Sequence, residues 1–333
     1  MSTDPSGDFR YPGYFWLRSI CARGEYYSVV AKTPSFVVSL LTQDNDYQVE
    51  QAASAEDAAR ALGVDVQIIY ADNDSILQSQ QILKFIQGNP ELHPDGIVLE
   101  PVGGTGLPQV ARAATDAGIG WVVLNREVGY VSQLRKLCAS PVFSLAADNQ
   151  EIGRIQGRQL AALAPKGGVV LYIQGPSDAD ASKLRSAGML ETKPSNIQVK
   201  IIKAQWTEAS AYKAITNWLQ LSTSQRAQID LICAQNDAMA AGARKAFQQF
   251  VNNDVKDHWT NLPFLGVDGV PKTGQAWVRE GSLAGTIITP PLAGKALEML
   301  VAALRSGRFP QETTLVEPRS YPTLESLANG RRG

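Results

Sequence analysis

The chain has 333 residues, enough for two domains, and its hydrophobic fraction of 44% and charged fraction of 19% are ordinary for a globular protein. The formal net charge of −1 argues against a nucleic-acid or anionic-membrane partner that is held by electrostatics. No apolar run in the sequence approaches the roughly 20 residues that are needed to cross a bilayer.

Residues 1–34 do not share the periodic pattern of the rest of the chain. The apolar run at residues 14–17 is interrupted by Arg18, so it is far short of a secretory signal. The residues before Cys21 are also wrong for a lipoprotein cleavage site, which requires small side chains. The sequence carries no legible export signal, and it leaves open whether a leader has been removed or the protein stays inside the cell.

In the first half of the chain, short apolar runs alternate with patterns of helical period. We expect helices at Tyr47–Leu62, with Gly63 as a left-handed cap, at Ile76–Gln87 and at Leu107–Ala117. The expected strands are Phe36–Thr42, Asp65–Ala71, Gly96–Pro101, Trp121–Asn125 and Val142–Ala147. This alternation is typical of right-handed βαβ units that build a parallel sheet.

The same order starts again after Asp148-Asn149. The expected helices are Glu151–Leu163, Ala181–Glu191, Ala209–Leu221, Lys272–Glu280 and Leu292–Arg305. The expected strands are Val169–Gln174, Val199–Gln205, Leu231–Ala234, Phe264–Val267 and Gly285–Ile288, with a short extended piece at Val316–Tyr321. Two similar α/β halves predict two lobes, each with its own parallel-type sheet.

The stretch 229–250 shows how a strand end can form a binding site. A buried strand stops at Gln235-Asn236-Asp237, and a helical pattern with small and apolar residues follows. Asp237 is placed to cap that helix. Asn236 lies at the carboxyl end of the strand, where open α/β sheets bind ligands, and its amide can both donate to and accept from a hydroxyl group. The alternative is an ordinary polar residue at a strand end.

The motifs of common enzyme and cofactor sites are missing from the sequence. The loop after the first strand is Gln43-Asp44-Asn45-Asp46, without the glycines of a nucleotide-binding GxGxxG. No GxSxG elbow, HExxH or paired catalytic carboxylates occur. The three cysteines and two histidines form no metal-binding or disulfide pattern. The sequence therefore predicts a protein that is not an enzyme and has neither a cofactor nor a metal site.

Polar and aromatic residues recur at the strand ends of both halves. Amide and carboxylate groups bind hydroxyls through directed hydrogen bonds, and arginine donates several more. Aromatic rings can stack on the C–H face of a sugar. Taken singly, each residue also has an ordinary role as a cap, a turn residue, a surface charge or a core side chain. The candidate ligand-binding residues are Asn45, Tyr47, Asn125, Arg126, Arg185, Trp206, Asn236, Asp268 and Thr289.

A set of motifs in fixed order carries a family resemblance from Ser35 to about Tyr321. The motifs are Asn125-Arg126 after Trp121-Val122-Val123-Leu124, then Ala147-Asp148-Asn149, Ala234-Gln235-Asn236-Asp237-Ala238-Met239, Gly266-Val267-Asp268-Gly269 and Leu283-Ala284-Gly285-Thr286-Ile287. With them the chain resembles the type I periplasmic sugar-binding proteins of the ribose/galactose group. It also resembles the effector-binding core of lactose-repressor-type regulators.

The resemblance implies two Rossmann-like lobes joined by three crossovers, near Asp148, Thr289 and Val316. Lobe 1 would hold residues 35–147 and 290–315, and lobe 2 residues 148–289 and 316–328, with residues 1–34 as an extension of unclear role. Asn45, Tyr47, Asn125 and Arg126 would bind ligand from lobe 1, and Arg185, Trp206, Asn236 and Asp268 from lobe 2, with Thr289 at a crossover. The lobes would close on the ligand about these hinges.

The function that the resemblance implies is a monomeric, periplasmic solute-binding receptor, with a cytoplasmic location left open. It would deliver a small sugar or polyol to an ABC permease. Three departures from the ribose binders, at Gln48, Asn125 and Thr289, leave open a hexose, a deoxy- or amino-sugar, or a cyclic polyol. The alternatives are a ligand sensor, either a repressor-type core or the receptor of a sensor kinase, and a sugar-acting enzyme. Residues 1–34 contain no helix pair typical of a DNA-binding domain.

Overall fold

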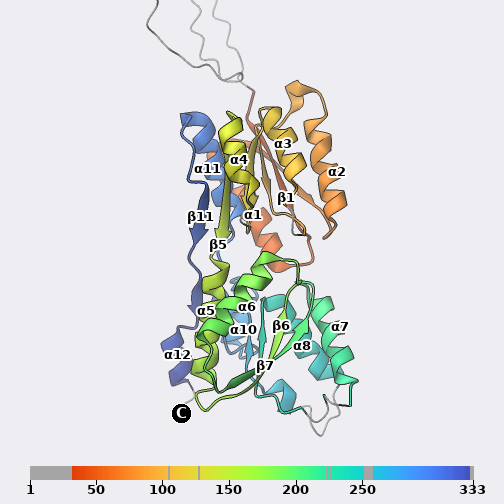
Figure 1. Ribbon diagram of the computed structural model, residues 1–333, viewed down its shortest axis with the longest axis vertical. Coiled ribbons are helices and arrows are strands. Elements are labelled where there is room, and N and C mark those ends of the chain that lie inside the picture. The colour runs from red at the N-terminus through yellow and green to blue at the C-terminus, as the bar shows by residue number, and fades with distance from the viewer. Residues whose placement is uncertain are drawn as a thin grey trace, which may run out of the picture. The chain divides into compact units, whose positions relative to one another are not determined.

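The computed structural model of the protein describes residues 32–103, 106–126, 128–222, 224, 227–250 and 258–330. From Thr33 onward the chain forms one compact unit, shown in Figure 1. The predictions made for residues 1–34, on an export signal and on Cys21, cannot be compared with the structure, because it describes only residues 32–34 of this segment. Among the described residues, no helix has both the length and the apolar composition that a membrane crossing requires.

The first sheet has six strands, all parallel, in the order β11-β5-β4-β3-β1-β2. Its central strands are almost fully buried, which explains their continuous apolar runs in the sequence. The strands are β1 (Ser35–Leu40), β2 (Asp65–Tyr70), β3 (Gly96–Leu99), β4 (Gly120–Leu124), β5 (Val142–Ala147) and β11 (Thr313–Val316).

Helices cover both faces of this sheet. Alternate side chains of β1 enter different cores: Phe36 and Val38 pack with α1 and α11, whereas Val37 belongs to the core on the other face, beneath α2, α3 and α4. The α1 helix begins at the Asn45 cap and ends at Gly63, whose φ of 66° confirms the expected left-handed cap. The helices are α1 (Asp46–Leu62), α2 (Ser75–Ile86), α3 (Pro108–Asp116), α4 (Tyr130–Leu137) and α11 (Ala293–Ser306), with the short η1 (Pro90–Leu92).

The second sheet has four parallel strands in the order β7-β6-β8-β9. On one face α7 and α8 pack against Leu171 and Ile173 of β6, and on the other α5 and α6 pack against Val170 and Tyr172. The strands are β6 (Gly168–Gln174), β7 (Ile197–Lys203), β8 (Leu231–Ala234) and β9 (Phe264–Leu265). The helices are α5 (Asn149–Leu163), α6 (Asp180–Thr192), α7 (Glu208–Leu219), α8 (Asp237–Phe250), α10 (Gly274–Arg279) and α12 (Leu324–Asn329).

We use lobe 1 for the part built on the six-stranded sheet and lobe 2 for the part built on the four-stranded sheet (Figure 1). The chain passes between them after β5, after β10 (Thr286–Ile288) and after β11. The expected α/β fold with parallel sheets is confirmed. The lobe boundaries at single-residue level stay a prediction.

The expected extended piece at Val316–Tyr321 is wrong as a single element. Val316 ends β11, which pairs with β5 in lobe 1, whereas β12 (Arg319–Tyr321) pairs antiparallel with β10. Pro318 lies between the two strands and has no N–H for a sheet ladder. Helices α4 and α12, with 8 and 6 residues, were not expected from the sequence.

Candidate functional site

The carboxyl ends of strands from both sheets meet at one cavity of about 90 Å³. In each sheet the order of strands reverses there, between β1 and β3 in lobe 1 and between β6 and β8 in lobe 2. Open α/β sheets bind ligands at such switch points. The structure brings all nine candidate residues to the wall of this cavity: Asn45, Tyr47, Asn125, Arg126, Arg185, Trp206, Asn236, Asp268 and Thr289. Their role in binding a ligand stays a prediction.

Asn45 and Asn236 use most of their amide groups to hold the protein itself. Asn45 caps α1, with Oδ1 accepting from the Tyr47 N–H at 2.9 Å, and its Nδ2 donates to the Trp206 carbonyl at 3.1 Å. Asn236 caps α8 through the Met239 N–H at 2.8 Å and donates to the same carbonyl at 2.8 Å. Each amide therefore keeps one N–H and one lone pair for a ligand.

The expectation that Asp237 caps α8 is wrong, because Asn236 already takes that role. Asp237 instead accepts from the Gly269 N–H at 2.8 Å and from the Thr286 hydroxyl at 2.7 Å. Burial, which penalises the charged form, raises the pKa of Asp237 to about 7. The side chain thus ties the start of α8 to β10 and to the loop that carries Asp268.

Tyr47 and Thr289 are fastened close to the chain crossing after β10. The Tyr47 hydroxyl donates to the Pro290 carbonyl at 3.2 Å, and burial raises the pKa of this tyrosine. Thr289 is buried and donates to the Asp268 carbonyl at 3.4 Å. Both side chains therefore connect the cavity wall to a hinge segment.

Arg185 and Trp206 form one unit in lobe 2. The guanidinium of Arg185 donates to Asn149 Oδ1 at 2.9 Å and to the Gln235 carbonyl, and its Nη2 has no hydrogen-bond partner among the residues that the structure describes. Its Cζ atom lies 5.5 Å from the centre of the Trp206 ring, within the range of a cation–π contact. The ring also lies against Gly175, where a Cβ atom would collide with it. Asn149, which sequence reasoning missed, orients this arginine.

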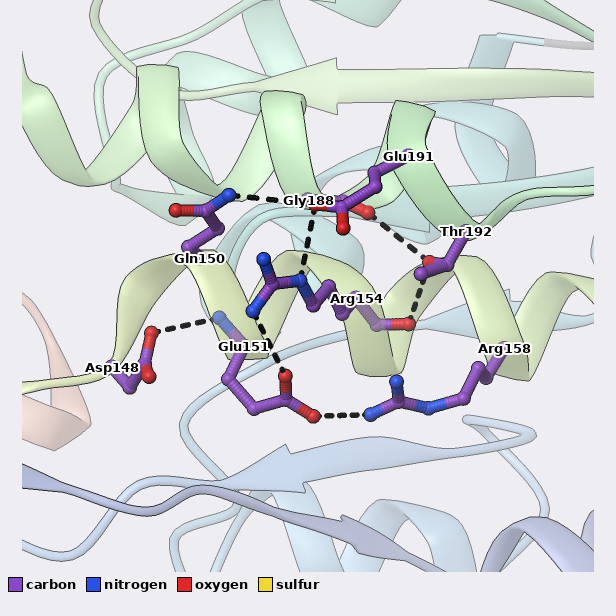
Figure 2. Close-up of polar contacts among 8 residues, drawn as sticks. All are labelled: Asp148, Gln150, Glu151, Arg154, Arg158, Gly188, Glu191 and Thr192. Atoms are coloured by element: carbon purple, nitrogen blue, oxygen red, sulfur yellow. Dashed lines mark hydrogen bonds and ion pairs between the residues drawn. The ribbon is translucent and has the colours of Figure 1, made fainter.

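The helices that carry Asn149 and Arg185 pack against each other at glycines. A Cβ atom on Gly153 of α5 would collide with the Arg185 carbonyl oxygen, and one on Gly188 of α6 with a carbonyl oxygen of α5. Figure 2 shows Arg154 of α5 between Glu191 of α6, at 3.0 Å, and Glu151, at 3.6 Å. Close backbone packing of α5 against α6 therefore holds the segment that carries Arg185, and the partly exposed ion pairs add little to it.

Glu100 also lines the cavity, and sequence reasoning missed it. Its Oε1 accepts from Asn125 Nδ2 and its Oε2 from Gln48 Nε2, both at 3.0 Å. The strand was expected to run to Pro101, but β3 ends at Leu99. Glu100 is therefore the first residue after the strand, a position typical of the candidate residues. Had the end of β3 been predicted correctly, Glu100 would have been among the candidates.

The described charged residues on the cavity wall are Glu100, Arg126, Arg185 and Asp268, whose formal charges sum to zero. Burial raises the pKa of Glu100 and that of Asp268, and the nearby Asp237 raises the pKa of Asp268 further. Burial lowers the pKa of both arginines; Asp180 and Glu100 oppose this for Arg126, and Asp268 opposes it most for Arg185. Arg126 donates to the Gly103 carbonyl.

Known proteins share this sequence pattern and fold. The periplasmic binding protein domain matches residues 36–308. The D-allose-binding periplasmic protein of Escherichia coli (strain K12) is 27% identical over 280 residues, which is 82% of this chain and 85% of that protein.

Two solved structures resemble the chain in fold. An ABC transporter periplasmic solute binding protein from Actinobacillus succinogenes 130z with bound D-allose has a TM-score of 0.74 at 21% identity, covering 89% of this chain and 100% of that one. The Caulobacter myo-inositol binding protein bound to myo-inositol has a TM-score of 0.72 at 22% identity, covering 90% and 96%. Because both proteins are less than 25% identical to this chain, their similarity to it establishes the fold alone.

Proposed function

The chain belongs to the periplasmic binding protein domain family, and from this premise we propose that it is a receptor for one small sugar or cyclic polyol. The ligand would be bound between the lobes and delivered to an ABC importer. The observation that carries the proposal is that the strand ends of both lobes contribute hydroxyl-binding and ring-stacking side chains to one cavity.

The size of the cavity supports a ligand with a single ring. An enclosed water needs roughly 10–15 Å³ on this measure, so about 90 Å³ holds about six to nine waters. That room is comparable with one six-membered ring and its hydroxyl groups.

The charges of the wall support a ligand without net charge. Two carboxylates and two guanidinium groups line the cavity. An uncharged polyol can donate to the carboxylates and accept from the guanidinium groups, and it leaves the net charge of the site at zero. Leaving one of these buried groups unpaired costs roughly 1–3 kcal/mol, which would make the site selective for a ligand that matches all of them.

The contact between Asn45 of lobe 1 and the Trp206 carbonyl of lobe 2 supports binding by closure of the lobes. A ligand that touches both walls adds contacts only when the lobes are together. It would therefore shift the population toward the closed form by that difference in contact energy.

The name of the allose-binding relative places that protein in the periplasm, and we propose the same location for this one. We further propose that the protein is a monomer and that it hands its ligand to a membrane permease without chemical change. A sensor kinase is the alternative partner, for which the protein would act as the receptor. Binding to the permease and not to a sensor kinase, or the reverse, distinguishes the two roles.

A thermal denaturation screen tests the proposal. The panel contains D-allose, D-ribose, other aldoses, deoxy- and amino-sugars, and myo-inositol, with an amino acid set as a control. We expect at least one sugar or polyol to raise the melting temperature in a saturable way. A well-folded protein that responds to no member of the panel, or to amino acids instead, would contradict the proposed ligand class.

A further inference from the structure

Glu100 is a buried carboxylate with no counter-charge paired to it. It is 7% exposed, and it forms no ion pair with a described residue. Its two hydrogen bonds come from neutral amides, Asn125 on one oxygen and Gln48 on the other. Buried carboxylates are strongly disfavoured unless paired or well hydrogen-bonded.

The two amide donors are themselves fixed in orientation. Gln48 Oε1 accepts from the Leu41 N–H at 3.1 Å, so its Nε2 must point to Glu100. Asn125 follows β4 directly and has a φ of 54°, a left-handed conformation that sets the direction of its side chain. The carboxylate is therefore held rigidly by groups that do not neutralise it.

This arrangement leaves acceptor capacity on Glu100, which lines the cavity. An ionised carboxylate has about four lone-pair sites, and protein donors use two of them here, one on each oxygen. On the lobe 2 wall, Asp268 is 8% exposed and its carboxylate makes no hydrogen bond with any residue that the structure describes. The Glu100 and Asp268 carboxylates, one on each wall, therefore keep acceptor sites that the hydroxyl groups of a ligand would fill.

We propose that Glu100 determines ligand specificity by accepting hydrogen bonds from two adjacent hydroxyl groups of the ligand, one at each carboxylate oxygen. This assignment rests on the proposed function and adds to it a preference for a ring with neighbouring hydroxyls at that position. The competing structural role, in which Glu100 only orients Gln48 and Asn125, predicts no dependence on any particular hydroxyl group.

The test combines a variant with ligand analogues. Dissociation constants are measured by calorimetry for wild type, Glu100→Gln and the control Glu298→Gln, whose exposed carboxylate lies on α11 and pairs with Lys295. The probes are whichever sugar or polyol of the thermal denaturation panel binds most tightly, together with its monodeoxy analogues. Unfolding in urea without ligand checks that each variant is folded, and Glu100→Asp replaces Glu100→Gln if that variant is not.

We expect two adjacent monodeoxy analogues to bind wild type and Glu298→Gln roughly tenfold or more weakly than the parent ligand. The parent ligand should bind Glu100→Gln roughly tenfold more weakly than it binds wild type. The same two analogues should bind this variant with nearly the affinity of the parent ligand, because the acceptor of their missing hydroxyl groups is already gone. Equal deoxy penalties on wild type and the Glu100 variant, or an unchanged affinity of that variant for the parent, would overturn the assignment while the proposed function stands. If no probe binds wild type, the proposed function fails, and the assignment fails with it.

Discussion

The side-chain amide of Asn45 in lobe 1 donates to the carbonyl oxygen of Trp206 in lobe 2 at 3.1 Å. Asn236 donates to the same oxygen at 2.8 Å, so one carbonyl of the cleft wall accepts from both lobes. Trp206 presents that carbonyl with a φ of 62°, a conformation that residues other than glycine adopt rarely. The Trp206 carbonyl therefore links the position of the Trp206 ring to the contact between the two lobes.

Asn45→Asp should weaken ligand binding without unfolding α1. Aspartate is as good an N-cap as asparagine, so the bond from the Tyr47 N–H is retained, whereas a carboxylate cannot donate to the Trp206 carbonyl. Losing one interlobe hydrogen bond of about 0.5–1.5 kcal/mol raises the dissociation constant roughly 2- to 12-fold. Calorimetry with the tightest sugar or polyol measures this change.

Asn89→Asp is the control for that variant. Asn89 likewise caps a helical turn, through the N–H of residue 91, but it is exposed and does not line the cavity. The Asn89→Asp variant should bind ligand with the affinity of wild type. If Asn45→Asp also binds as wild type does, the interlobe bond has no part in closure.

Trp206→Ala should strongly reduce, at a fixed ligand concentration, the rise in melting temperature that ligand causes. The ring lines the cavity and is held by Gly175 and Arg185, so its loss removes both a stacking face and the support of the guanidinium. Truncating such an aromatic anchor commonly costs roughly 2 kcal/mol or more, about thirtyfold in affinity.

Trp277→Ala separates binding from stability in this experiment. Trp277 is a half-buried residue of α10 that packs against the core of lobe 2 and does not line the cavity. This variant should be less stable than wild type, yet ligand should still raise its melting temperature. A normal ligand-induced rise in Trp206→Ala would contradict the role given to that ring.

Gly153→Ala should lower both stability and affinity. The added methyl group would collide with the Arg185 carbonyl oxygen, so α5 and α6 must separate and carry Arg185 away from its place. Overpacking of this kind costs about 1–3 kcal/mol. Urea unfolding and ligand titration measure the two effects. Gly129→Ala is the control, since its φ is −61° and a Cβ atom there meets nothing within 4 Å; equal results for both variants would argue against the helix contact.

Asp237 should make the ligand-free protein less stable as the pH rises. Burial raises its pKa to about 7 in the folded protein, against about 3.9 in an unfolded chain. The hydrogen bonds from Thr286 and Gly269 oppose this rise, the charge of Asp46 adds to it, and Arg185 opposes it weakly. The folded state therefore holds the proton more tightly, and ionisation disfavours folding. The contribution of the Asp237 carboxyl to the free energy of unfolding is therefore greatest below about pH 4. It falls between pH 4 and 7, and it is lost above that range.

Asp237→Asn isolates this contribution. An asparagine can still accept from the Gly269 N–H and can donate to the Thr286 hydroxyl, so the packing is retained without the charge. Between pH 5 and 8 the free energy of unfolding should fall less in the variant than in wild type, the remaining fall coming from Glu100 and Asp268, whose pKa values are also raised. Identical pH profiles for the two proteins would exclude Asp237 as the source.

Much of the fold was predictable because buried parallel strands are apolar on both faces, as β4 and β8 are. The site followed from that pattern, since polar residues such as Asn236 stand where the apolar run stops. The failures occurred where local signals are weak. The end of β3 is not marked by composition, so Glu100 was taken as a strand residue. No sequence pattern tells which residue of a pair such as Asn236-Asp237 caps the helix, because both side chains are good caps.

Calorimetric titration of wild type with the panel of sugars and polyols tests the central claim most directly. We expect saturable binding of a monosaccharide or cyclic polyol with one site for each chain, and no binding of amino acids. A folded protein that gives no saturable heat with any sugar or polyol, even at roughly millimolar concentration, would contradict the claim that the shared cavity holds such a ligand.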